Sequence, residues 1–139
     1  MKPINIVGVL KGGVVAGLIM NVSEFILNVP VAGARMEAEL KAINLPPPGG
    51  GAIALFSLVT LALGILLIWV YAAIRPRLGP GPKTAICAGL VIWTLSYLYA
   101  SLFFGGLGVN SWGLIALGLV WSLVECLLAA LAGAYLYSE

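Results

Sequence analysis

Residues 52–74 decide the fold: the segment AIALFSLVTLALGILLIWVYAAI is 23 residues long and carries no charged side chain. About 20 apolar residues in a helix are enough to cross the ~30 Å hydrocarbon core of a bilayer. The segment is therefore predicted to span a membrane. Three further apolar segments, at 10–29, 84–106 and 112–137, meet the same requirement.

The composition of the whole chain agrees with four spans. Hydrophobic residues make up 62% of the 139 residues and charged residues 9%, whereas a soluble domain carries about 25% charged residues. We predict an all-α integral membrane protein, in which residues 1–139 form a single four-transmembrane-helix bundle. Its main partner is then the lipid bilayer, because the basic residues are too few and too dispersed for a nucleic-acid surface.

The basic residues also predict the orientation, because Lys and Arg are enriched in cytoplasmic segments near the ends of spans. Four spans leave both chain ends on the same side of the membrane. The side of the chain ends carries more basic residues than the opposite side, namely Lys2, Lys11, Arg75, Arg77 and Lys83 against Arg35 and Lys41. We expect both termini to be cytoplasmic, in a bacterial cytoplasmic membrane.

The connection between the first two spans is predicted to contain a short amphipathic interfacial helix at 31–45. Met36, Leu40 and Ile43 recur at helical spacing, which gives this helix one apolar face. We expect it to lie on the outer membrane surface with that face down. Prolines at 46–48 then end the helix, and glycines at 49–51 free the chain to enter the second span.

A glutamate interrupts the first predicted span, in the run Asn21-Val-Ser-Glu24-Phe-Ile-Leu-Asn28. A charge-capable side chain at membrane depth costs roughly 2.5 to 3.5 kcal/mol on insertion scales, so it needs a partner or a purpose. Three interpretations are open. Glu24 is bonded to Asn21, Asn28 or another polar neighbour and holds helices together, or it binds a proton or cation, or it contacts a partner subunit.

The last span repeats part of this pattern. The run from Gly118 to Glu125 matches the run from Gly17 to Glu24 at the glycine, a leucine, a small polar residue and the glutamate. The two helices cross the membrane in opposite directions, so the match indicates either an inverted pseudo-symmetry of the kind that transporters use or a chance similarity. If these helices pack together, the two carboxyl groups are neighbours and share a proton.

Deep aromatic residues are candidates for the same site. Trp93, Trp121 and Tyr97 either pack as ordinary apolar groups or wall a cavity that suits an organic cation. The complete candidate proton, cation or buried polar site consists of Glu24, Asn21, Asn28, Glu125, Ser122, Tyr97, Trp93 and Trp121.

Glycines at helical spacing predict close helix packing, since a missing side chain lets two backbones approach. The same spacing satisfies an intramolecular bundle or a homo-oligomer. The candidate packing positions are Gly8, Gly12, Gly13, Gly17, Gly64, Gly118 and Gly133.

The chain contains no His and no Asp, which excludes bis-His haem, His-based metal sites and Ser-His or Cys-His catalysis. We expect no enzyme, no metal and no cofactor. In architecture the chain is similar to the small multidrug resistance transporters, which are compact four-helix proteins with a glutamate in the first span. The surroundings of Glu24 and the long first connection differ from that family, so we transfer no residues from it.

Two classes of function remain. The sequence favours a non-catalytic accessory or scaffolding subunit that packs against a membrane-protein partner or a second copy through its small-residue faces. The alternative is a proton-coupled small-molecule or organic-cation transporter that uses the intramembrane Glu24.

Overall fold

The computed structural model describes residues 3–138, which fold entirely into helices and connections without a strand. The elements are α1 (Ile6–Ile26), a π-helical turn (Leu27–Val31), α2 (Gly33–Ala42), α3 (Gly50–Leu78), α4 (Pro82–Ile92), a second π-helical turn (Trp93–Leu98), α5 (Tyr99–Gly106) and α6 (Trp112–Leu136). Four continuous segments are long and apolar enough to cross a membrane: Ile6–Val31, Gly50–Leu78, Pro82–Gly106 and Trp112–Leu136. The predicted all-helical bundle with four spans is confirmed.

The first two spans extend further toward the C-terminus than predicted, because proline does not end the helix at either place. The first span continues through Pro30, which lacks a backbone N–H and lies in a π-helical turn. The amide of Ala32 donates to the Leu27 carbonyl at 2.7 Å and closes this turn. The second continues past Pro76, and the left-handed Gly79 (φ 83°) follows its last residue. Pro76 lies near the end of α3, where the loss of one backbone donor disturbs little of the helix.

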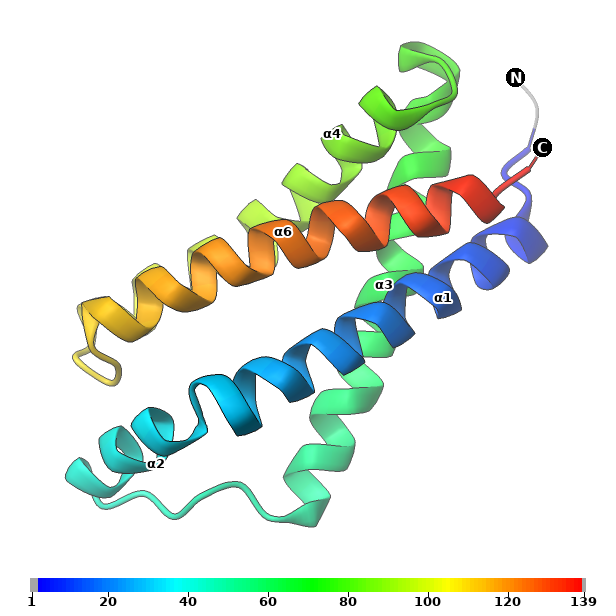
Figure 1. Ribbon diagram of the computed structural model, residues 1–139. Helices are drawn as coiled ribbons and strands as arrows, with labels where there is room; N and C mark the ends of the chain where they lie inside the picture. The colour runs from blue at the N-terminus through cyan, green and yellow to red at the C-terminus, as the bar shows by residue number, and fades with distance from the viewer. Residues whose placement is uncertain (1–2, 139) are drawn as a thin grey trace.

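The helices are arranged around α1, which packs against both α3 and α6, while α4 packs against α3 and α6. Figure 1 shows α1 and α6 side by side, with α3 crossing behind them and both chain ends at the same end of the bundle. Asn5 ties these ends together, since its side chain donates to the Ser138 carbonyl at 2.8 Å. The expectation that the two ends share one side of the bundle therefore agrees with the structure.

Glycine allows close contacts between helices of the bundle. A side-chain carbon added to Gly64 in α3 would overlap the backbone of Gly17 in α1 and lie 2.8 Å from the Gly13 carbonyl oxygen. One added to Gly133 in α6 would lie 2.7 Å from the carbonyl oxygen of Gly12. Backbone therefore lies directly on backbone at the α1–α3 and α1–α6 crossings.

Of two other predicted packing positions, Gly8 lies in a close contact and Gly118 does not. A side-chain carbon at Gly8 would lie 3.0 Å from the ring of Tyr137, so Gly8 packs beneath the end of α6. The packing expectation for Gly118 needs correction, since apart from its own neighbouring helix residues no heavy atom lies within 4 Å of the corresponding position there. Helical spacing placed Gly118 among the small residues of the last span, but this position of the helix faces open space.

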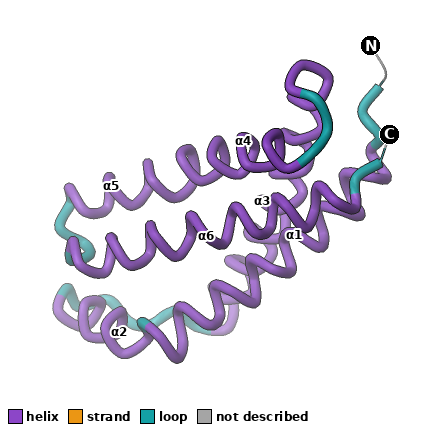
Figure 2. The backbone as a smooth tube through the Cα atoms, turned by 45° about the horizontal axis from the view of Figure 1, so that its top comes forward, coloured by secondary structure: helices purple, strands orange, loops and turns teal. Residues whose placement is uncertain are grey.

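The helix in the first connection is shorter than predicted, at Gly33–Ala42, and it is not isolated on a surface. Its Met36 packs against a small cluster formed by Leu27, Ala32 and Leu114. In Figure 2, α2 lies beside the turn that joins α5 to α6. The amphipathic helix therefore covers one end of the bundle.

Candidate functional site

Glu125 in α6 is the most deeply buried ionisable side chain of the candidate site, with 3% of its surface exposed. Its Oε1 accepts a hydrogen bond of 3.0 Å from the Tyr97 hydroxyl, which the second π-helical turn positions. Its Oε2 is buried and has no hydrogen-bond partner. The side chains of Ser23 and Glu24 lie within hydrogen-bonding range of this carboxyl group, but the geometry of neither contact makes a hydrogen bond to Oε2.

Glu24 lies opposite in α1 and is half-buried. The amide of Asn28, one turn later, donates to its Oε2 at 2.8 Å and to its backbone carbonyl at 2.7 Å. Packing of α1 against α6 thus brings two glutamates from distant parts of the sequence into one site. The site contains the polar pairs Glu24–Asn28 and Glu125–Tyr97.

Other predicted site residues hold the helices around this pair. The Trp121 indole donates to the Ser23 hydroxyl at 2.9 Å and links α6 to α1. The Trp93 indole donates to Ser122 Oγ and to the carbonyl of Leu119, each at 3.1 Å, and links the third span to α6.

Asn21 belongs to a different contact. Its amide donates to the Gly17 carbonyl at 2.9 Å and to the Ser57 carbonyl at 3.2 Å, and so joins α1 to α3. The structure does not bring Asn21 to the Glu24 carboxyl, although the sequence offered it as a partner. The i+4 neighbour Asn28 takes that role, while Asn21 lies on the face of α1 that packs against α3.

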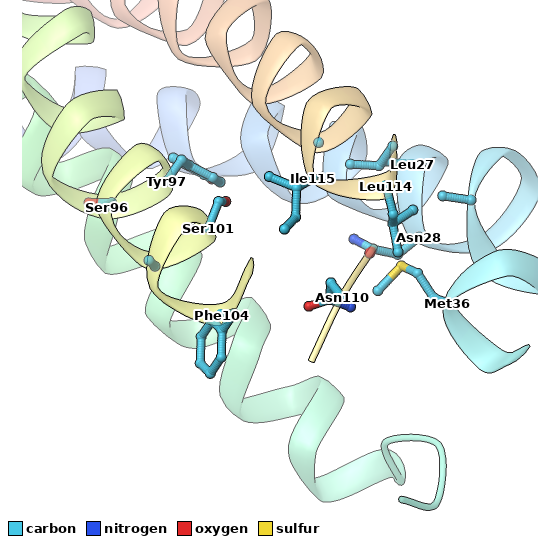
Figure 3. Close-up of a pocket in the computed structure, with 13 residues that line it drawn as sticks. Leu27, Asn28, Met36, Ser96, Tyr97, Ser101, Phe104, Asn110, Leu114 and Ile115 are labelled. Atoms are coloured by element: carbon cyan, nitrogen blue, oxygen red, sulfur yellow. The ribbon is translucent and has the colours of Figure 1, made fainter. Parts of the chain in front are cut away.

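A cavity of about 240 Å³ lies next to the carboxyl pair, between the two π-helical turns, α2, α5 and α6. Figure 3 shows side chains from these elements around it. Its polar lining consists of Asn28, Ser96, Tyr97, Ser101 and Asn110, and the larger apolar side chains are Leu27, Met36, Phe104, Leu114 and Ile115. The cavity therefore touches both residues that hydrogen-bond to the glutamates.

The composition of the wall differs from the prediction in two respects. Tyr97 lines the cavity, but Trp93 and Trp121 do not, because their indoles are turned into the helix contacts described above. Gly118 does line it, which explains the open space beside that glycine.

A third glutamate lies at the α2 side of the cavity. Glu39 accepts from the backbone N–H of Ser111 at 3.1 Å, from the Asn110 amide at 3.3 Å and from the Ser111 hydroxyl. These bonds, led by that of the Ser111 hydroxyl, hold the pKa of Glu39 below its usual value, and Arg35 acts in the same direction. Glu39 thereby fixes α2 on the turn between α5 and α6.

Glu39 was not among the candidates from the sequence. An acidic residue in a short polar helix is usually solvated, and only the spatial neighbourhood of the α5–α6 turn distinguishes it from Glu37. Ser23 also was missed, although it lies next to Glu24 in the run that drew attention to the first span. Within residues 3–138, no three Cys or Glu side chains are grouped to hold a metal ion.

The chain was compared with protein-family models, curated proteins and solved structures. None of them matches it.

Proposed function

We propose that this protein is a small membrane carrier that couples the movement of a small molecule to a proton, with Glu24 and Glu125 as the proton-exchanging groups. The observation that carries the proposal is the unpartnered Oε2 of Glu125, buried beside a second carboxyl group. Neither an enzyme nor a cofactor is part of the proposal. The basic residues favour chain ends in the cytoplasm and α2 on the outer side.

The energy of the buried glutamate argues against a purely structural role. A buried polar atom without a partner costs roughly 1 to 3 kcal/mol, and interhelical hydrogen bonds in membranes average only about 0.6 kcal/mol. A residue selected to join helices would be favoured with both oxygens bonded. Glu125 has one bonded oxygen, and the other is available to hold a proton.

The cavity supplies a physical means of coupling. Asn28 and Tyr97 both line it, and each donates a hydrogen bond to one of the two carboxyl groups. A molecule that binds in the cavity and contacts either residue changes the surroundings of the carboxyl group to which that residue is bonded. A nearby charge or an altered hydrogen bond changes the relative stability of the charged and protonated carboxyl group, so binding and proton exchange become linked.

The groups that surround Glu125 agree with exchange of a proton. The side chains that act on its carboxyl group are Ser23, Glu24 and Tyr97, and the adjacent Cys126 thiol lies within the same environment. No basic side chain is among them. Two neighbouring carboxylates without a counter-ion repel each other, which favours one shared proton over two charges.

An accessory subunit remains the second candidate, and one observation favours it. The first half of α3 is uncovered: Ile53, Leu55, Phe56, Leu58 and Val59 are each more than half exposed. Lipid covers such residues as well as a partner protein does, so this surface supports the accessory function less directly than Glu125 supports exchange.

Proton movement in proteoliposomes tests the proposal. The vesicles hold an acidic interior and a trapped pH indicator, and receive benzyltrimethylammonium, betaine or glycerol, which are cationic, zwitterionic and neutral. At least one probe is expected to release protons through the native protein, and Glu125→Gln should abolish the release. Glu37→Gln is the matched control, because it removes a carboxylate on the exposed side of α2.

Proton release by none of the probes, or equal proton release through the native protein and through Glu125→Gln, would contradict the carrier proposal. Thermal unfolding of each variant, followed by tryptophan fluorescence, separates loss of transport from loss of fold.

A further inference from the structure

We propose that the cavity binds a small organic cation with an apolar body. This inference rests on the proposed carrier function and names its substrate class. It follows from the hydrogen bonds around the cavity, from the charges behind its wall and from its size.

Three of the five polar wall residues donate hydrogen bonds to glutamates. The Asn28 amide donates to Glu24 at 2.8 Å, and the Tyr97 hydroxyl donates to Glu125 at 3.0 Å. Asn110 is the third such wall residue, and its amide donates to Glu39 at 3.3 Å. Each of these polar groups belongs to a different element of the wall, and each is backed by a carboxyl group.

This arrangement leaves acceptors for a ligand. The Asn28 amide gives both bonds to Glu24 and the Tyr97 hydroxyl gives its hydrogen to Glu125, so the polar atom left on each of these side chains is an oxygen that accepts. Asn110 keeps an accepting oxygen and one N–H, and the hydroxyls of Ser96 and Ser101 can accept or donate. A ligand that donates, or that carries a positive charge, satisfies the accepting oxygens, whereas an anion does not.

The charge behind the wall has the same sign on three sides. No charged side chain lines the cavity, but Glu24, Glu125 and Glu39 are each one hydrogen bond away from a lining residue. Among residues 3–138, Arg35 is the one basic residue that acts on Glu39; its side chain is exposed, and its guanidinium lies beside Gly113 of α6. The surroundings of the cavity are thus acidic on balance, which attracts a cation.

Apolar groups and size restrict the cation further. Phe104 and Tyr97 offer rings, with which a cation interacts favourably, and Leu27, Met36 and Leu114 offer aliphatic surface. The volume of about 240 Å³ equals roughly eight water molecules at ~30 Å³ each, which is smaller than a typical drug-sized pocket. A compact amine or quaternary ammonium ion with one ring or a short chain fits this space.

Binding to the purified protein tests the inference without any gradient. Isothermal titration in detergent compares benzyltrimethylammonium with benzyl alcohol, which has a ring but no charge. The cation is expected to bind at least tenfold more tightly. Equal or tighter binding of the alcohol, or no binding of the cation, would overturn the inference.

Two glutamates on α2 provide a matched pair of variants. Glu39→Gln and Glu37→Gln each remove one negative charge from the same helix, but only Glu39 is bonded to a wall residue. Glu39→Gln should weaken cation binding severalfold more than that of benzyl alcohol, because loosening of α2 affects both ligands and the lost charge affects only the cation. Equal effects of the two substitutions would count against a role of the wall's hydrogen bonds.

The two proposals fail separately. If the cation binds as expected but no probe releases protons in vesicles, the carrier proposal fails and the cation site stands. If betaine or glycerol releases protons while the cation does not bind, the carrier stands and the substrate class is wrong.

Discussion

Substitution of Gly64 with alanine should force α1 and α3 apart. The added carbon would overlap the Gly17 backbone and lie 2.8 Å from the Gly13 carbonyl oxygen, where about 3.4 Å is the lower end of ordinary contact. Relief at this oxygen alone requires a shift of at least 0.6 Å, which is 3.4 minus 2.8. The atoms in the way are backbone, so no side chain can rotate to make room.

The size of the effect follows from two opposing terms. Overpacking of a well-packed interior costs about 1 to 3 kcal/mol, and a rigid backbone neighbour places this site in the upper half of that range. Alanine gains up to about 1 kcal/mol over glycine in helix propensity. The free energy of unfolding should therefore fall by about 1 to 2 kcal/mol, which lowers the melting temperature by several degrees.

Gly118→Ala is the matched substitution for this measurement. It makes the same chemical change within a long helix, but apart from its own neighbouring helix residues no heavy atom lies within 4 Å of the new carbon. Thermal unfolding in dodecylmaltoside micelles, followed by tryptophan fluorescence, should show a lower melting temperature for Gly64→Ala and an equal or higher one for Gly118→Ala. The same shift in both variants, or none in Gly64→Ala, would refute the close α1–α3 contact.

Three further predictions concern the site. The pKa of Glu39 is lowered from 4.5 in the folded protein, so its bonds to the α5–α6 turn should stabilise α2 above about pH 4.5 and be lost as the pH falls through the folded value. Below that pH, amide hydrogen exchange of α2 in the native protein should become as fast as in Glu39→Gln, where it should be fast at either pH. If the two exchange rates do not converge, Glu39 does not hold α2 on the α5–α6 turn. Tyr97→Phe removes the donor to Glu125 Oε1 and should reduce probe-driven proton release at least tenfold with an unchanged fold by circular dichroism; full release would exclude Tyr97 from the coupling. Ser23→Ala breaks the bond from Trp121 and should cost about 0.6 kcal/mol of unfolding free energy, so a loss of several kcal/mol would contradict a simple interhelical bond.

The helices themselves were predictable because hydropathy depends on local sequence alone. Long apolar runs with at most two charged residues each gave all four spans, and the glycine spacing in the first span drew attention to Gly12, Gly13 and Gly17. The ends of the spans were harder to predict. Pro30 and Pro76 normally break helices, and only a π-helical turn or proximity to the helix end makes them tolerable.

The site was predictable only in part, because it depends on which helices are neighbours. Glu24 and Glu125 stood out as ionisable groups in apolar surroundings. Their proximity depends on the packing of α1 against α6, and the sequence pattern of each helix does not specify which helices are neighbours. Glu39 was missed for a related reason: its partners, Asn110 and Ser111, follow it by about 70 residues in the sequence.

The bond from Trp121 to Ser23 has a consequence for biosynthesis, since these residues are 98 positions apart. At a synthesis rate of about 5 to 20 residues per second, the first helix waits roughly 5 to 20 s for the last one. During that interval Glu24 has no neighbour from α6. The bond from Asn28 spans only four residues and is available as soon as the first helix forms, so the nascent helix carries its own temporary partner for the glutamate.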